Sequence, residues 1–269
     1  MQDTGSEERW NTPMLDDYEI RVLGPIDVLT PSGSIAVGGR HVRALLGALV
    51  IGVGHAVRID HLREAIWAQD PPDSADNTLQ SSVSRLRRVL GPDAIVRVDG
   101  SYELTTPPER IDAIQFEMLL AKAAESRDDP ERSRRYGRAA LDLWRGPPFG
   151  DLAEDEAFKL DSYRLDEMRL AAMEICLEAE LALGNHELIV GELEAAVEEN
   201  PYREHLWFLL IEALDAGYRR VEALRACARL RRMLAETGVQ ASDELKLLEQ
   251  RILDGHAASQ ATPGDGSSA

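Results

Sequence analysis

The sequence has little cysteine. Cys176 and Cys227 are its two cysteines, and neither stands in a metal-ligand spacing. We expect both to be buried as small apolar side chains in a reducing compartment. No apolar run approaches the roughly 18 residues of a membrane span, and the polar, acidic residues 1–17 do not form a signal peptide. These absences predict a cytoplasmic protein that makes no membrane contact.

The chain also lacks the motifs that carry enzymatic chemistry. It contains no G-x-x-x-x-G-K-[ST] loop and no G-x-S-x-G turn. Its six histidines show no H-x-x-x-H spacing, and carboxylate pairs such as Glu198–Glu199 are typical of a solvated helix face. We therefore expect no catalytic residues, no metal and no cofactor.

Negative charge is abundant but unevenly distributed. The formal net charge is −18 over 269 residues. Residues 18–105 hold ten acids and nine bases, whereas residue 106 to the end holds 33 acids and 20 bases. The chain is long enough for two domains with real cores. The second would carry most of the acid, so the first could still approach a polyanion, although with weak non-specific affinity.

The first domain shows a mixed order of strands and helices. The expected elements are strands within 18–28 broken at Gly24–Pro25, a strand over 34–37, a helix over 40–53, a strand over 56–59, a helix capped by Asp60, a helix over 77–91, and strands over 95–98 and 102–104. Strands, three helices and a terminal hairpin predict an α+β winged helix with an N-terminal sheet.

The helix from Asn77 is the most informative segment. Leu79, Val83, Leu86 and Leu90 are spaced to form one apolar stripe. The other side carries amides, hydroxyls and guanidinium groups, which suit base edges and phosphates in a major groove. These candidate DNA-binding residues are Asn77, Gln80, Ser81, Ser84, Arg85 and Arg88.

The second half predicts a chain of helices with short breaks. The breaks fall at 128–130, 146–148, Gly184, Pro201, Gly217 and Gly238. Gly184 and Gly217 are 33 residues apart, and at this offset Leu188 matches Val221, Leu193 matches Ala226 and Val197 matches Leu230. Helical pairs near this period indicate an all-α, tetratricopeptide-like repeat domain whose apolar positions form its core.

Several motifs carry a family resemblance. They are G-G-R-H-V-R-A-L-L at 38–46, I-W-A-Q-D-P-P at 66–72, N-T-L-Q-S-S-V-S-R-L-R-R at 77–88, L-W-R-G-P-P-F at 143–149 and N-P-Y-R-E at 200–204. Residues 18–105 resemble the OmpR-type effector domain of the SARP family of activators, and residues 106–254 resemble the bacterial transcriptional activator domain. Residues 1–17 and 255–269 are expected to be a disordered leader and tail.

The resemblance implies a role for Arg85, and the positions of four further arginines suggest roles for them. Arg85 matches the groove-facing side of the recognition helix and is the first choice for a base or phosphate contact. Arg87 would pack its stem and extend its guanidinium to a phosphate, while Arg40 and Arg43 would contact the DNA backbone or pair with nearby acids. Arg97 could reach a phosphate from the wing, although Asp99 places an opposing charge at the wing tip.

Partners are implied as well. In OmpR-type activators the turn before the recognition helix faces RNA polymerase, and here it presents Asp70, Pro71, Pro72 and Asp73. The family would bind promoter DNA as a homodimer on direct repeats. An alternative is a helical-repeat interaction or ligand-sensing regulator whose DNA binding is weak or lost; Asp99 and the net charge of −18 favour it.

Overall fold

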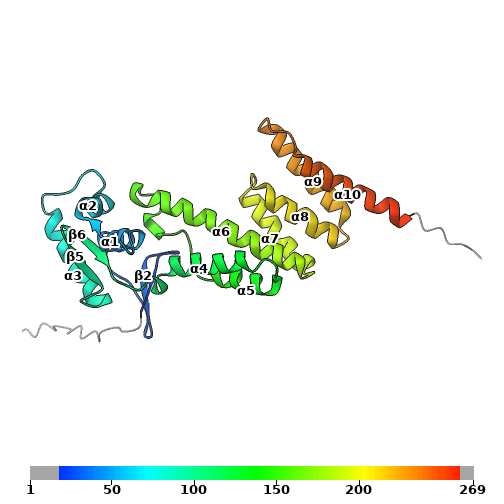
Figure 1. Ribbon diagram of the computed structural model, residues 1–269. Helices are drawn as coiled ribbons and strands as arrows, with labels where there is room; N and C mark the ends of the chain where they lie inside the picture. Colours follow the sequence, from blue (N-terminus) through cyan, green and yellow to red (C-terminus); the bar gives the residue numbers. More distant parts are fainter. Residues whose placement is uncertain (1–17, 261–269) are drawn as a thin grey trace, which may run out of the picture. The chain divides into compact units, whose positions relative to one another are not determined.

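The computed structural model describes residues 18–260, with side chains through residue 254. The described residues fall into two units, one of residues 18–121 with 138–171, the other of residues 122–137 with 172–260 (Figure 1). Residues 1–17 and 261–269, on which the leader and most of the tail were predicted, lie outside the described residues.

The first unit begins with a small antiparallel sheet. Its strands are β1 (Glu19–Arg21), β2 (Asp27–Thr30) and β3 (Gly33–Ile35), in that order. Ile20 pairs with Val28, and both side chains are fully buried. The break between β1 and β2 falls at Gly24–Pro25, as the sequence predicts.

Three helices and a hairpin follow. They are α1 (Arg40–Ile51), β4 (Val57–Arg58), α2 (Ile59–Trp67), α3 (Ala75–Leu90), β5 (Ile95–Val98) and β6 (Ser101–Leu104). The second sheet has the order β4-β6-β5, so the hairpin is joined by the short strand between α1 and α2. This arrangement confirms the predicted winged helix.

Asp60 does not cap α2, contrary to the expectation. The helix already begins at Ile59, with Arg58 at the cap position and no side-chain cap. The Asp60 carboxylate instead accepts hydrogen bonds from Arg58 (3.2 Å) and Arg63 (3.4 Å). It lies in the first turn, where a negative charge still suits the helix dipole.

The unit is completed by segments that follow the hairpin. These are the short helix η1 (Pro108–Arg110), α4 (Asp112–Glu125), α5 (Pro130–Leu141), the short helix η2 (Gly150–Leu152) and α6 (Glu156–Ala182), of which α4, α5 and α6 each run into the second unit. The backbone N–H groups of Arg145 and Phe149 donate to the carbonyls of Leu23 and Val22, at 2.8 and 2.7 Å. The loop after α5 is therefore hydrogen-bonded to the chain that leaves β1.

Asp112 strengthens the same junction from the start of α4. Its carboxylate is 1% exposed and accepts the N–H groups of Val22 (2.8 Å) and Leu23 (3.0 Å). Arg145 lies 3.5 Å away. Burial raises the pKa of Asp112 to about 6, and the backbone bonds and Arg145 oppose that rise.

Gly47 on α1 allows α6 to approach closely. A Cβ at this position would come within 2.7 Å of the Phe158 ring, which is fully buried. Phe158 also stacks at a tilt on Phe149, with 5.3 Å between ring centroids. The winged helix and residues 149–158 consequently share one core.

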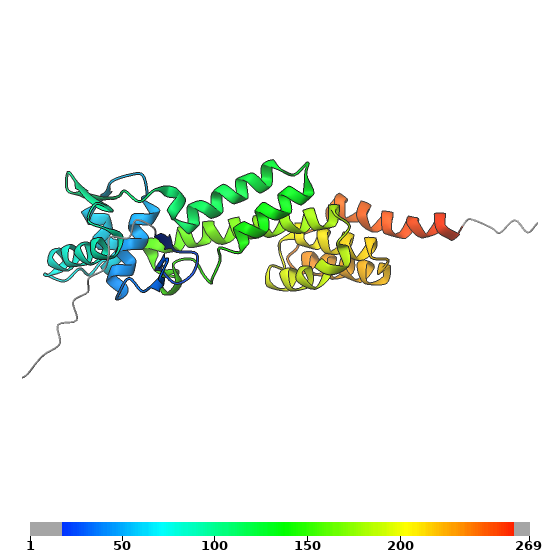
Figure 2. The same cartoon turned by 90° about the horizontal axis from the view of Figure 1, so that it is seen from below.

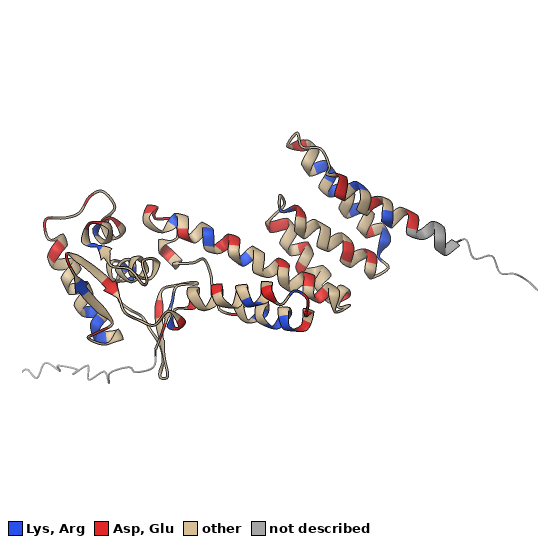
Figure 3. Cartoon of the chain, in the orientation of Figure 1, with Lys and Arg blue, Asp and Glu red and all other residues tan. Residues whose placement is uncertain are grey.

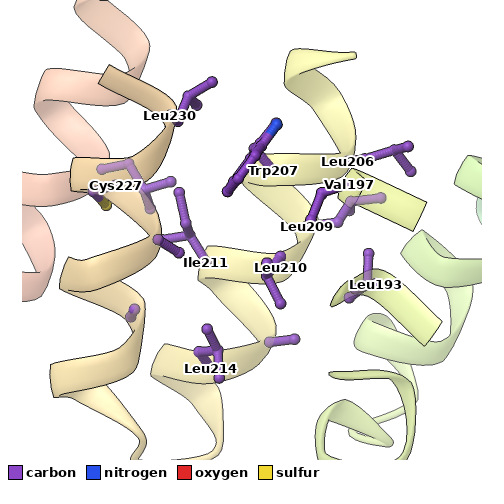
Figure 4. Packing of buried hydrophobic residues seen from close by; sticks show 14 of the residues in the cluster. Leu193, Val197, Leu206, Trp207, Leu209, Leu210, Ile211, Leu214, Cys227 and Leu230 are labelled. Carbon is purple, nitrogen blue, oxygen red and sulfur yellow. The ribbon is translucent and has the colours of Figure 1, made fainter. Parts of the chain in front are cut away.

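The second unit is helical. It contains the end of α6 and the helices α7 (His186–Glu199), α8 (Glu204–Ala216), α9 (Arg220–Glu236) and α10 (Asp243–Gln260), shown from below in Figure 2. Figure 4 shows side chains of α8 packing on both sides, with Ile211 toward the helix that carries Cys227 and Leu206 toward Val197. The breaks between these helices fall where the sequence predicts them, which confirms the helical-repeat architecture.

The 33-residue offset is reflected in burial, with one correction. Leu193 and Ala226 are both buried, as are Val197 and Leu230. Leu188 and Val221, expected in the core, are 81% and 63% exposed. Leu188 lies near the start of α7 and Val221 near the start of α9, and both side chains face solvent. The 33-residue offset therefore matches positions with similar surroundings, but these two positions are not buried.

The last helix extends beyond the expected start of the tail. α10 continues to Gln260 and passes through Gly255. A single glycine costs about 1 kcal/mol in a helix interior, and here it does not end the helix.

Candidate nucleic-acid interface

The two faces of α3 differ as the sequence predicts. Its apolar stripe is buried, with Leu79, Val83, Leu86 and Leu90 between 0% and 3% exposed. The residues of the opposite face are all exposed: Asn77, Gln80, Ser81, Ser84, Arg85 and Arg88. In Figure 3 the ribbon of α3 carries basic residues toward its C-terminal end. The helix is therefore held by its stripe and presents a polar face.

Two hydroxyl groups on this face are bonded to the helix itself. Ser84 Oγ donates to the Gln80 carbonyl at 2.9 Å, and Ser81 Oγ donates to the Thr78 carbonyl at 3.3 Å. These bonds keep both side chains close to the backbone. A phosphate or base acceptor would have to compete with a helix carbonyl for each proton.

Arg85 is positioned by a glycine at the start of α1. Gly38 has φ +114°, and a Cβ there would lie 3.2 Å from both Cδ and Nη1 of Arg85. Only glycine combines this backbone conformation with such a close approach. Among the described residues no carboxylate pairs with Arg85 or Arg88, so both cations are available to an external anion.

Arg40 and Arg43 at the start of α1 are paired with acids. Arg40 forms an ion pair with Asp155, and Arg43 Nη2 lies 2.6 Å from Asp151 Oδ2. Arg43 also donates to the Gly38 carbonyl at 3.0 Å. The hydrogen bond from the Arg43 guanidinium to the Asp151 carboxylate lowers the pKa of Asp151. The sequence left two alternatives for these arginines, a contact with the DNA backbone or pairing with nearby acids, and in the structure both arginines pair with acids.

A cleft of about 450 Å³ lies between the start of α1 and the exposed side of α3. Its lining is Gly39, Arg40, His41, Val42, Thr78, Ser81, Ser82, Arg85 and Arg88. Helix α1 begins beside this cleft and has no side-chain cap, so its first amides have no side-chain acceptor at the cap position. Cations, hydroxyls and helix amides together suit a phosphate group.

Five cleft residues were not among the predicted contacts: Gly39, His41, Val42, Thr78 and Ser82. His41 packs against Trp67 with 5.4 Å between ring centroids, which fixes its position beside the cleft. The pair Gly38–Gly39 ahead of a helix was the available signal, because it brings the start of α1 close to the neighbouring helix.

Arg87 differs from the other arginines of α3. It is half-buried, and its Nε donates to the Ile95 carbonyl at 2.8 Å. The side chain thus ties α3 to β5. Its stem packs as expected, but the guanidinium holds a backbone carbonyl of the same unit.

The wing has a two-residue turn at Asp99–Gly100. Both residues have positive φ, 41° and 75°, between the paired residues Val98 and Ser101. Such a hairpin turn favours Asp-Gly, which explains an acid at the tip. Arg97 is exposed and lies over the Tyr102 ring, 6.0 Å from its centroid.

The expected polymerase-contact loop is exposed along its whole length. Asp70, Pro71, Pro72 and Asp73 connect α2 to α3 and face solvent. The Ala75 N–H donates to the Pro72 carbonyl at 2.9 Å, which closes the turn into α3.

Residues 18–260 show no sign of a metal centre or a membrane span. They contain no group of three or more potential metal ligands. None of their helices is both long enough and apolar enough to cross a membrane. Cys176 and Cys227 are buried and form no disulfide.

Comparisons with known proteins identify both parts of the chain. The model of the bacterial transcriptional activator domain matches residues 111–253, more than half of the chain, and that of the C-terminal domain of transcriptional regulatory proteins matches residues 38–101. The chain belongs to the SARP family of transcriptional regulators.

Individual relatives match over both units. Regulatory protein DnrI of Streptomyces peucetius is 32% identical, over 87% of this chain and 92% of that protein. Regulatory protein AfsR of Streptomyces griseus is 36% identical over 88% of this chain, which spans 25% of AfsR. The solved structure of Mycobacterium tuberculosis EmbR in complex with a low affinity phosphopeptide has a TM-score of 0.83 and 29% identity, covering 94% of this chain and 73% of that one.

Proposed function

We propose that this chain is a sequence-specific DNA-binding regulator that activates transcription in the cytoplasm. The observation that carries the proposal is the exposed face of α3, where Arg85 and Arg88 have no acidic partner among the described residues and border the cleft at α1. In an acidic chain, unpaired cations beside short polar side chains are suited to a major groove.

The contacts fall into two kinds. Arg85, Gln80 and Asn77 would reach base edges, while Arg88 and the cleft would hold phosphates. Arg97 would contact the backbone from the wing. Arg87, Arg40 and Arg43 are secondary contacts, because each already has a partner within the chain.

The test is a gel shift on the DNA upstream of the protein's own coding region. Arg85→Ala should weaken specific binding by about 1–3 kcal/mol without lowering the melting temperature. Arg232→Ala removes another exposed arginine, in α9, and should leave binding unchanged. Equal affinity of the wild type and Arg85→Ala would contradict the recognition-helix assignment.

A second candidate is a helical-repeat interaction regulator with weak DNA affinity. The pairing of Arg40 with Asp155 and of Arg43 with Asp151 favours it, because two cations near the cleft are neutralised. A salt series separates the candidates. Specific binding that persists at physiological salt supports the activator, and binding that is uniformly weak and insensitive to sequence supports the alternative.

Two partners complete the proposal. The exposed loop of Asp70, Pro71, Pro72 and Asp73 would contact RNA polymerase, because prolines present neighbouring side chains at little entropic cost. The protein would bind direct repeats as a homodimer. Both ideas rest on the family resemblance, and the polymerase contact rests also on the exposure of the loop.

A further inference from the structure

Tyr218 occupies a backbone position that its neighbouring turns give to glycine. Helices α6, α8 and α9 end in the same way, with an N–H bonded to the carbonyl five residues earlier, at 2.8–2.9 Å. The left-handed residue at these ends is Gly184 (φ +79°), Tyr218 (φ +60°) and Gly238 (φ +79°). Such turns prefer glycine, and an aromatic residue is strained there.

The strained conformation of Tyr218 is not compensated by packing of its side chain within the chain. The side chain is 96% exposed. Val221, 63% exposed, follows one helical turn later, and Arg219 and Arg220 lie between them. The turn therefore projects an aromatic ring flanked by two cations. A strained residue without an internal contact points to an external role.

A groove of about 700 Å³ in the same unit has the complementary chemistry. It lies between α8 and α10, and its apolar lining is Phe208, Leu209, Leu247 and Leu248. Leu247 is 71% exposed, so the lining includes an apolar side chain left open to solvent.

The charged residues around the groove leave it acidic. Glu204, Glu212 and Glu244 line it together with Arg251 and His205. Arg251 is paired with Glu212 at 2.9 Å, and His205 with Glu178 at 2.6 Å. Glu204 and Glu244 have no ion pair among the described residues, and residues 172–254 contain 17 acids against nine bases.

We propose that the turn of Tyr218 docks in the α8–α10 groove of a second copy of this chain. The ring would cover Leu247 and Phe208, and Arg219 and Arg220 would face Glu204 and Glu244. Arg219 now pairs with Glu222, and Arg220 donates to the Leu253 carbonyl at 2.5 Å. Docking would replace both interactions, which lie at exposed sites where such interactions exchange at little cost. This proposal rests on the homodimer proposed above and names the residues that would hold the two copies together. The contact itself does not require DNA.

Cysteine cross-linking tests the contact directly in the 269-residue chain. The native cysteines are buried and do not compete. Tyr218→Cys protein is mixed with Leu247→Cys protein under mild oxidation, and the mixture should give a covalent dimer that neither variant gives alone. The matched control mixes Tyr218→Cys with Leu188→Cys, because Leu188 is similarly exposed but lies outside the groove. Equal yields in the two mixtures, or no dimer in either, overturn the proposal.

Tyr218→Gly separates docking from folding. Glycine relieves the left-handed strain, so the melting temperature should stay the same or rise, while cooperative binding to DNA with two half-sites should be lost. Binding to a single half-site should not change. Loss of that binding would count against the DNA-binding proposal and not against docking. Tyr202→Gly, at a 70% exposed tyrosine outside the turn, should keep cooperativity. Retained cooperativity in Tyr218→Gly contradicts the docking role.

Discussion

Removing the carboxylates of Asp151 and Asp155 should strengthen DNA binding. These acids neutralise Arg43 and Arg40, and Arg40 lines the cleft beside α3. In the double variant Asp151→Asn/Asp155→Asn both arginines keep their positions on α1 but lose their anionic partners. A DNA phosphate would then meet two more uncompensated cations.

The size of the effect follows from the exposure of the pairs. The side chains of Arg40 and Asp155 are 47% and 32% exposed, and those of Arg43 and Asp151 are 26% and 55%. Exposed pairs are each worth about 0–1 kcal/mol, so affinity should rise by up to roughly 2 kcal/mol. If both arginines reach phosphates, the slope of log K against log salt should steepen by about 1.8, or about 0.9 for each contact.

The assay is fluorescence anisotropy on operator DNA across a salt series. Glu154→Gln/Glu156→Gln is the control, since it removes two charges from the same region where no ion pair involves either acid among the described residues. An equal gain in the control would mean that only net charge matters. An unchanged slope in the aspartate variant would show that Arg40 and Arg43 do not reach phosphates.

Three further predictions concern stability, polymerase and assembly. Asp112→Ala leaves the amides of Val22 and Leu23 unpaired in the interior, so denaturant titration should show an unfolding free energy lower by about 2–4 kcal/mol. Because the pKa of Asp112 is raised to about 6 in the folded state, this carboxyl favours folding most at low pH, and its contribution to the unfolding free energy should decline between about pH 4 and 6; a flat difference between wild type and variant over that range would contradict the raised pKa. Asp70→Lys/Asp73→Lys should keep promoter binding but reduce transcription in a reconstituted assay, and full activation would place the polymerase contact elsewhere. Inserting roughly half a helical turn between two half-sites should abolish cooperative footprints, whereas protection that ignores the insertion would indicate independent monomers.

Local periodicity predicted the parts of the fold that rest on local interactions. The stripe from Leu79 to Leu90 is buried because its spacing matches one helix face. The burial of Leu193 with Ala226 follows from the repeat in the same way. Exposure of Leu188 could not be read from its apolar side chain, because burial at that position depends on whether another element covers it.

The electrostatics of the interface depend on contacts between distant residues. Arg40 and Asp155 are 115 residues apart, and Arg43 and Asp151 are 108 apart. No local pattern identifies such partners. The sequence did predict the exposed face of α3, but not that Gly38 would press against Arg85, since that contact depends on the packing of α1 on α3.

The contact of Phe158 with Gly47 has a practical consequence for exchanging DNA-binding modules between relatives. A graft that ends near residue 105 would leave behind the aromatic ring that fills the groove on α1, and also the backbone donors of Arg145 and Phe149. The transplanted winged helix would expose apolar surface that Phe158 normally covers, and the carbonyls of Val22 and Leu23 would lose their hydrogen-bond donors. A chimera intended to change promoter choice should carry the chain through residue 171, where the first unit ends.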